Sequence, residues 1–411
     1  MACRVLRVGI LGDQFINWGG GVDFLRLVCG SLAATQSAID IHVLFPVRGP
    51  LHRINTMKLT LKQLTFFLLG RPSGVIDTPN LEQVQSNLLL ATGSVTFHQI
   101  DVGSFSLRKA CRKLDLDVLL PSIRPLPIEC EVPWIGYLYD MQHKHLPQLF
   151  SEREVQQRDF NFKEMVDRSQ MVMVNSRSVV NDLADSFPSA SENIFSLPFS
   201  PAPSSDWFRL GGVGFLEKYR IVNRYFIVCN QFWKHKDHTT AIKAFAEFSK
   251  KYPDIDLVCT GATFDYRDPS YFSYLKKMIF ELGIDQKVRI LGLIPKVDQI
   301  ALMRGSLALI QPTLFEGGPG GGAVYDAVGL GVPCIVSDID VNREIDEDAV
   351  CFFKTGDADD LFMAMNTIYQ NSFDRKEVDS TELLARGQMR WRSCGQVILN
   401  SIRKLTKISD I

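Results

Sequence analysis

A glycine-rich loop at residues 317–322 is the segment whose residue types best suit chemistry. It follows an apolar run at 307–310 and precedes a helical pattern at 323–328. Glycines let a backbone approach a ligand closely, and free N–H groups at a helix N-terminus attract anions. Carboxylates beside such a loop can accept hydrogen bonds from sugar hydroxyls. We therefore predict a diphosphate site with contacts from Gly318, Gly320, Gly321, Gly322 and Ala323, flanked by Glu316 and Asp326.

A basic cluster forms a second candidate site. The apolar run 225–229 ends at Asn230 and Gln231, and Lys234, His235 and Lys236 then open a helical pattern. Cations at a strand end would stabilise the charge that develops on a departing diphosphate. A solvated basic turn is the alternative interpretation.

Two segments of the N-terminal half also follow predicted strands. Residues 19–21 are glycines before a helical pattern at 22–32, but they do not form G-x-G-x-x-G, and no acidic residue ends the second strand. This is a weak dinucleotide signal. Residues 136–150 follow a strand and contain Asp140 and His143, so we expect them at the rim of a cleft.

Residues 315–337 resemble the signature of the family 4 retaining glycosyltransferases, which have the GT-B fold and include mannosyltransferases. The matching residues are Phe315, Glu316, Gly317, Ala327, Gly331, Pro333, Ile335 and Ser337. The resemblance implies that Glu316 contacts the donor sugar and Asp326 the ribose. The loop between these carboxylates is two residues longer than the family pattern.

The resemblance extends to the other segments. It implies that Lys236 binds the donor phosphates, with Gln231 where the family has arginine and Lys234 as a substitute cation. It also implies that Gly20 and Gly21 face the diphosphate. Asp140 and His143 match family positions that line the catalytic site, and Tyr139 replaces a usual histidine.

Short apolar runs that alternate with helical patterns predict an α/β chain built on parallel sheets. We expect the GT-B arrangement of two Rossmann-like, doubly wound domains facing a cleft. The Pro- and Ser-rich stretch 198–206 predicts the linker. The expected units are an acceptor-binding domain at 1–205, a donor-binding domain at 206–388, and a C-terminal helix at 389–411 that packs back on the N-terminal domain.

Composition narrows the function. The 411 residues carry a net charge of -1, so a nucleic-acid partner is not expected. Nine scattered cysteines without a C-x-x-C pair favour neither a disulfide framework nor a zinc site. No signal peptide or membrane-spanning run is found, which predicts a cytoplasmic protein. Residues 51–69 mix apolar and basic side chains, typical of a helix at a membrane surface or of a core-facing helix with a basic side.

The predicted activity is transfer of a hexose, of mannose or glucose type, from a nucleoside-diphosphate sugar to a hydroxyl of a glycan or lipid-linked acceptor. The resemblance implies retention without a metal or other cofactor. Asp338 and Asp340 fall outside the place expected for a catalytic metal pair. The alternatives are a GT-B epimerase or phosphorylase, a catalytically silent partner subunit, and a nicotinamide-dependent oxidoreductase.

Overall fold

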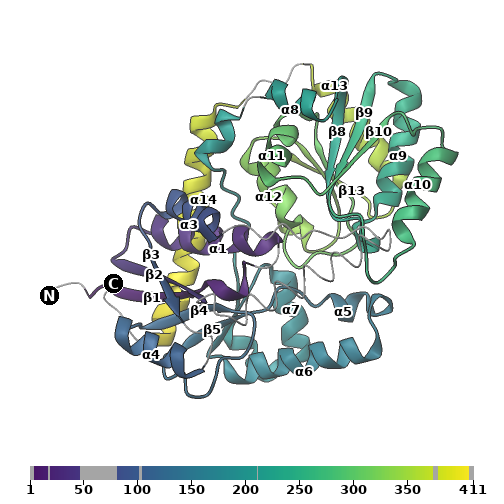
Figure 1. Ribbon diagram of the computed structural model, residues 1–411. Helices are drawn as coiled ribbons and strands as arrows, with labels where there is room; N and C mark the ends of the chain where they lie inside the picture. The colour runs from purple at the N-terminus through teal and green to yellow at the C-terminus, as the bar shows by residue number, and fades with distance from the viewer. Residues whose placement is uncertain are drawn as a thin grey trace, which may run out of the picture.

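The computed structural model describes residues 4–16, 19–46, 81–100, 104–210, 212–373 and 378–406. The segment 51–69 lies outside these residues. Within them the chain forms two parallel sheets, one in each half, and each sheet has helices on both faces (Figure 1). This is the layering that parallel strands require, since both of their faces are apolar.

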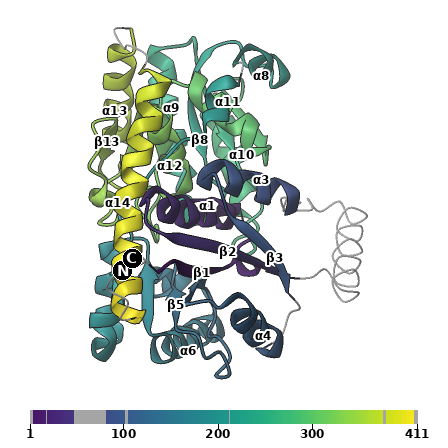
Figure 2. The same cartoon turned by 90° about the vertical axis from the view of Figure 1, so that its left-hand side faces the viewer.

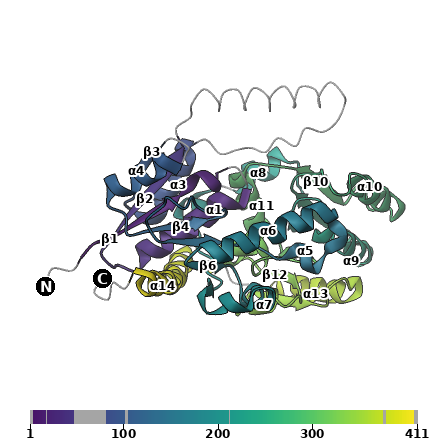
Figure 3. The ribbon, with the colours of Figure 1, turned by 90° about the horizontal axis from the view of Figure 1, so that it is seen from below.

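The N-terminal sheet has the strand order β3-β2-β1-β4-β5-β6-β7. All of its neighbouring strands are parallel. The strands are β1 (Leu6–Leu11), β2 (Ile39–Pro46), β3 (Thr96–Ile100), β4 (Val118–Ser122), β5 (Trp134–Tyr137), β6 (Met171–Val174) and β7 (Ile194–Ser196). One face packs on α1 (Gly19–Ala34) and α3 (Leu81–Thr92). The other packs on α4 (Ser104–Leu114), α6 (Glu152–Arg168) and α7 (Arg177–Ser186), and Figure 3 looks onto α6 from below.

The C-terminal sheet has the order β10-β9-β8-β11-β12-β13, again all parallel. Its strands are β8 (Arg224–Cys229), β9 (Ile255–Thr260), β10 (Val288–Gly292), β11 (Leu309–Gln311), β12 (Cys334–Ser337) and β13 (Val350–Phe353). One face packs on α9 (His238–Lys251), α10 (Tyr271–Glu281) and α13 (Ala358–Asn371). The other packs on α8 (Gly212–Lys218), α11 (Lys296–Gly305) and α12 (Gly321–Gly329).

The last helix, α14 (Ser380–Thr406), runs alongside both domains and packs on α1 (Figure 2). Two glycines permit this crossing. A Cβ on Gly30 would lie 2.4 Å from the Trp391 ring, and one on Gly395 would lie 1.9 Å from the Ser31 carbonyl oxygen. The predicted return of the C-terminal helix to the N-terminal domain is confirmed, although the helix begins at Ser380 rather than Met389.

The apolar runs at 225–229 and 307–310 are the strands β8 and β11, with bounds that agree within two residues. The sequence did not indicate β7 or β13, which are short and only partly buried. Residues 197–204, between β7 and the 3-10 helix η4 (Ser205–Arg209), have no regular secondary structure. No helix in the described part of the chain has the length and hydropathy needed to cross a bilayer.

Candidate active site

The site is built where β8 and β11 end. These strands are parallel neighbours, with Leu309 opposite Ile227. Their carboxyl ends therefore meet at one edge of the sheet, where ligands of open α/β sheets bind. After β8 the chain forms the 3-10 helix η5 (Lys234–Lys236) and then α9, and after β11 it forms the Glu316 loop and then α12.

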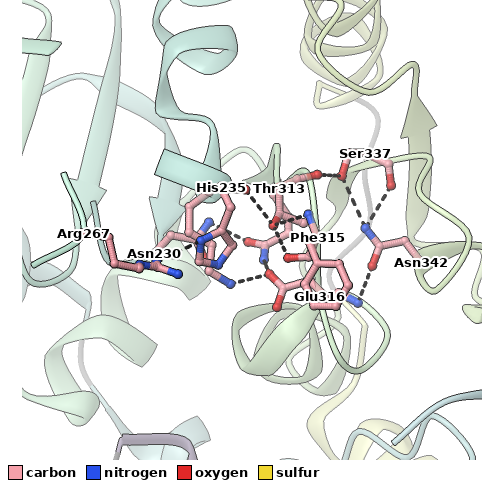
Figure 4. Close-up of polar contacts among 11 residues, drawn as sticks. Asn230, His235, Arg267, Thr313, Phe315, Glu316, Ser337 and Asn342 are labelled. Atoms are coloured by element: carbon pink, nitrogen blue, oxygen red, sulfur yellow. Dashed lines mark hydrogen bonds and ion pairs between the residues drawn. The ribbon is translucent and has the colours of Figure 1, made fainter. Parts of the chain in front are cut away.

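A chain of polar contacts joins the two strand ends (Figure 4). Asn230 Nδ2 donates to Gln311 Oε1 at 2.9 Å, and Gln311 Nε2 donates to Glu316 Oε1 at 3.0 Å. Lys236 Nζ forms an ion pair with the same Glu316 oxygen. The side chains of Lys236 and Glu316 are each only 11% exposed. The structure thus brings together a buried cation and a buried carboxylate that were both expected to be catalytic.

The glycine loop is held by bonds of its own. Ser337 Oγ donates to the Thr313 carbonyl oxygen at 2.6 Å, and Asn342 Nδ2 donates to the Ser337 carbonyl oxygen at 2.9 Å. Asn342 Oδ1 then accepts from the Gly320 N–H at 2.7 Å. These contacts fix the loop between β11 and α12 before any ligand enters.

The expected amide contacts of the loop are therefore partly occupied. The N–H of Gly320 binds Asn342, and that of Gly321 donates to the Gly318 carbonyl oxygen at 3.3 Å. A Cβ on Gly322 would meet no atom within 4 Å, so open space adjoins this position. Gly322 is the loop glycine best placed for close approach of a ligand, and Ala323 follows it in the first turn of α12.

Two other loop glycines serve contact between the domains. A Cβ on Gly317 would lie 2.0 Å from the Tyr139 carbonyl oxygen, and one on Gly318 would lie 2.8 Å from Asn175 Cβ. Ser176 Oγ also donates to the Gly317 carbonyl oxygen at 3.3 Å. Here the absence of side chains lets the loop touch the ends of β5 and β6, a reason for glycine that phosphate binding does not require.

The basic cluster contains a histidine that stays neutral. Burial, together with the neighbouring charges of Lys236 and Arg267, lowers the pKa of His235 to about 2. His235 Nδ1 lies 3.2 Å from Arg267 Nη2 and must accept this bond, because a guanidinium only donates. The positive charges of Lys236 and Arg267 therefore both act on one uncharged ring.

Comparisons with known proteins show which family and fold this part of the chain resembles. Residues 219–381, which include Lys236 and Glu316, match the family model of glycosyl transferases group 1. This part of the chain belongs to that family. No curated protein is similar enough in sequence to count as a relative.

Solved structures share the fold of the chain along its whole length. HepE (Alr3699) of Anabaena, in complex with UDP and glucose, has a TM-score of 0.63 and 14% identity, covering 97% of this chain and 100% of its own. A glycosyltransferase from Rickettsia africae has a TM-score of 0.61 and 13% identity, covering 99% and 100%. Sucrose-phosphate synthase from Thermosynechococcus elongatus has a TM-score of 0.58 and 13% identity, covering 98% and 100%. The predicted GT-B fold is confirmed.

Arg267 is a residue of the glycosyltransferase site that sequence reasoning missed. It lies in the loop after β9, is 7% exposed, and bonds Asp265 and, across the domain boundary, Gln142 Oε1 at 3.2 Å. Its guanidinium lies 4.9 Å from the centre of the Trp233 ring. Its position after a strand was the one signal available from sequence.

Two other residues expected at the phosphates are more exposed to solvent than Arg267. Lys234, expected to substitute for the family's arginine, is 58% exposed and its Nζ lies 3.3 Å from Asp268. Gln231 is exposed. Between Lys234 and Arg267, the buried Arg267 is the stronger candidate to supply the charge that Gln231 lacks, because burial strengthens electrostatic interactions.

The N-terminal candidates are only partly as expected. Asp140 Oδ1 accepts from Arg158 Nη1 at 3.1 Å, and Asp140 adjoins Gly317. The side chain of His143 is fully buried, and its Nε2 lies 2.9 Å from Asp159 Oδ1 on α6. Burial lowers the pKa of His143, although Asp159 opposes this. These contacts pack His143 within the N-terminal domain, and its expected role in catalysis stays a prediction.

A second histidine of this segment, His145, lies next to Phe315, two residues before the glycine loop. The His145 ring centre is 5.3 Å from that of Phe315, and its Nε2 lies 2.8 Å from Asp182 Oδ2. His145 belongs to the short helix α5 (Gln142–His145), which precedes the 3-10 helix η2 (Pro147–Leu149).

The remaining candidates lie in the helices α1 and α12. Gly20 and Gly21 lie in the first turn of α1. Asp326 is 6% exposed on α12, and its Oδ2 lies 2.5 Å from Lys296 Nζ. Burial raises the pKa of Asp326 to about 6, which the charge of Lys296 opposes.

Proposed function

We propose that this enzyme transfers a hexose from a UDP-sugar to a hydroxyl of a glycan or lipid-linked acceptor, with retention and without a metal. The observation that carries the proposal is the buried Lys236–Glu316 pair at the joined ends of β8 and β11. A buried ammonium group can stabilise the negative charge of a departing diphosphate. A carboxylate beside it can accept hydrogen bonds from the hydroxyls of the donor sugar.

Other features support a nucleotide donor. Gly322 borders open space at the start of α12, where a helix N-terminus favours an anion. Asp326 lies one turn further along the same helix and is the carboxylate proposed to bind the ribose hydroxyls. The choice of uridine rests on HepE, which has been solved with UDP and glucose and with UDP-glucose. A sugar of glucose or mannose type remains the proposed donor group.

The N-terminal domain is the proposed acceptor side. We place the enzyme in the cytoplasm, where a lipid-linked acceptor would bring it to the inner face of a membrane through residues 51–69. Binding to vesicles with anionic lipids, compared with neutral ones, tests this contact.

Calorimetric titration with UDP, GDP, dTDP and ADP, with NAD alongside, tests the donor site. We expect UDP to bind most tightly, and we expect Lys236→Met and Glu316→Gln to weaken that binding at least tenfold. Lys250→Met is a matched control, because Lys250 is an exposed lysine of α9 paired with Glu247. Equal UDP binding by the wild type and by Lys236→Met, Glu316→Gln and Lys250→Met would refute the proposal. Binding of NAD and of no nucleoside diphosphate would also refute it.

A further inference from the structure

Lys296 links the two domains at the carboxylate proposed to bind ribose. It is the first residue of α11, and its Nζ lies 2.5 Å from Asp326 Oδ2 on α12. The same Nζ lies 3.0 Å from Asp23 Oδ2 on α1, in the N-terminal domain. One lysine therefore contacts two carboxylates that belong to different domains.

The three side chains differ in exposure. Asp326 has 7% of its side chain exposed, whereas Lys296 has 39% and Asp23 has 46%. The buried carboxylate thus lies on the C-terminal side, and the lysine and the second carboxylate border solvent. Lys296 and Asp23 are thus in contact with solvent, whereas Asp326 is reached past them.

Charges around Asp326 come from several elements. Lys296 on α11 and Arg26 on α1 favour its ionised form, while burial and Asp23 on α1 oppose it. The Cys229 thiol of β8 also lies within electrostatic range. Burial alone would lower the pKa of Lys296, but Asp23 and Asp326 outweigh it, so this pKa is raised and the lysine stays charged. Lys296 is the strongest of the groups that hold Asp326 ionised.

We propose that Lys296 is a positioning residue for the donor: it holds the Asp326 carboxylate ionised for the ribose hydroxyls and, through Asp23, couples nucleotide binding to contact between α1 and the C-terminal domain. The inference rests on the proposed function, because it requires Asp326 to accept hydrogen bonds from ribose. An ionised carboxylate offers acceptors on both oxygens, whereas a protonated one gives up part of that capacity. Loss of Lys296 or of Asp23 should therefore change the pH dependence of nucleotide binding in opposite directions.

The test is the affinity for UDP between pH 5 and 8 in Lys296→Met, Asp23→Asn and the control Lys218→Met. Lys218 also pairs with a buried carboxylate, that of Asp298 on α11, at 2.5 Å, but the pair lies within one domain. In Lys296→Met we expect the acid limit of binding to move up by about one pH unit, a loss of roughly fivefold at pH 6. In Asp23→Asn the acid limit of UDP binding should move to lower pH, and in Lys218→Met it should be unchanged. Lys296→Arg should restore the wild-type profile.

The outcomes are separable. Unchanged profiles in Lys296→Met and Asp23→Asn, or the same shift in Lys296→Met and Lys218→Met, would overturn the positioning role while UDP still binds. Equal UDP affinity in Asp326→Asn and wild type would overturn the contact with ribose. Absence of UDP binding by the wild-type enzyme would instead overturn the proposed function itself. Circular dichroism of each variant checks that the chain is folded.

Discussion

Lys236 and Glu316 are 80 residues apart in the chain, yet their side chains form an ion pair at the meeting point of two parallel strands. Each follows a different strand, and the pairing of β8 with β11 places them face to face. Breaking a buried pair leaves an unpaired charge, so substitution at either position has consequences beyond loss of a ligand contact.

Loss of the lysine should affect turnover. In Lys236→Met we expect the rate of UDP release from UDP-glucose to fall by about 100- to 1000-fold, because one preorganised charge at a developing anion contributes about that factor. Initial-rate assays with thermal melting would measure it. The control Lys250→Met should retain the wild-type rate, and a Lys236→Met enzyme within threefold of wild type would contradict the role of this cation.

Gly317 should not tolerate a side chain. In Gly317→Ala the new methyl group would meet the Tyr139 carbonyl oxygen, 2.0 Å from an ideal Cβ, so the glycine loop and β5 would have to separate. We expect a lower melting temperature and a larger radius of gyration in solution scattering. Gly214→Ala is the control, since a Cβ there meets nothing within 4 Å. Identical scattering from Gly317→Ala and wild type would show that the loop does not hold the domains together.

Arg267 should contribute to both stability and donor binding. It pairs with Asp265, which is 2% exposed, so Arg267→Ala would leave a buried carboxylate without its cation. Such a break costs about 3 kcal/mol of the free energy of unfolding. Urea unfolding would measure this, and titration with UDP would show the loss of charge at the site. The exposed pair of Arg386 with Glu382 offers a control, for which we expect about 0.5 kcal/mol or less. An equal loss of unfolding free energy in Arg267→Ala and Arg386→Ala would contradict the prediction.

Acid should destabilise the chain through two histidines. Burial is the main reason that the pKa of His235 falls to about 2 and that of His238 to about 3. The unfolded chain binds protons on these rings below about pH 6.5, and the folded chain does not. The contribution of these two neutral rings to the free energy of unfolding is therefore fully present above pH 6.5. It is lost progressively as the pH falls toward about 3.

The slope of this decline can be tested with His238→Phe, which preserves a ring that can stack on Phe232. Urea unfolding at pH 7 and pH 5 gives the free energy of unfolding at each pH. Between these pH values it should fall less in His238→Phe than in wild type, by up to about 1.4 kcal/mol per pH unit. Equal slopes would show that His238 takes up a proton while folded.

The sequence alone determined the two-domain α/β fold and the position of the glycine loop, because both depend on local patterns of residue types. Apolar runs of strand length alternate with helical periodicity, and a glycine loop between strand and helix identifies itself without reference to distant residues. The same reasoning placed Lys236 and Glu316 at strand ends. It missed β7 and β13, whose few residues are only partly buried and leave little pattern.

Tertiary structure decided which candidates meet. Arg267 reaches His235 from 32 residues away, and Lys296 reaches Asp23 from 273 residues away, with no spacing rule connecting them. His143 matched a family position, but the packing of α5 on α6 buries its ring against Asp159 and Phe162. Local sequence records the type of each side chain. Which neighbours neutralise, bury or orient it depends on how the sheets, helices and domains pack, and only the folded chain contains that information.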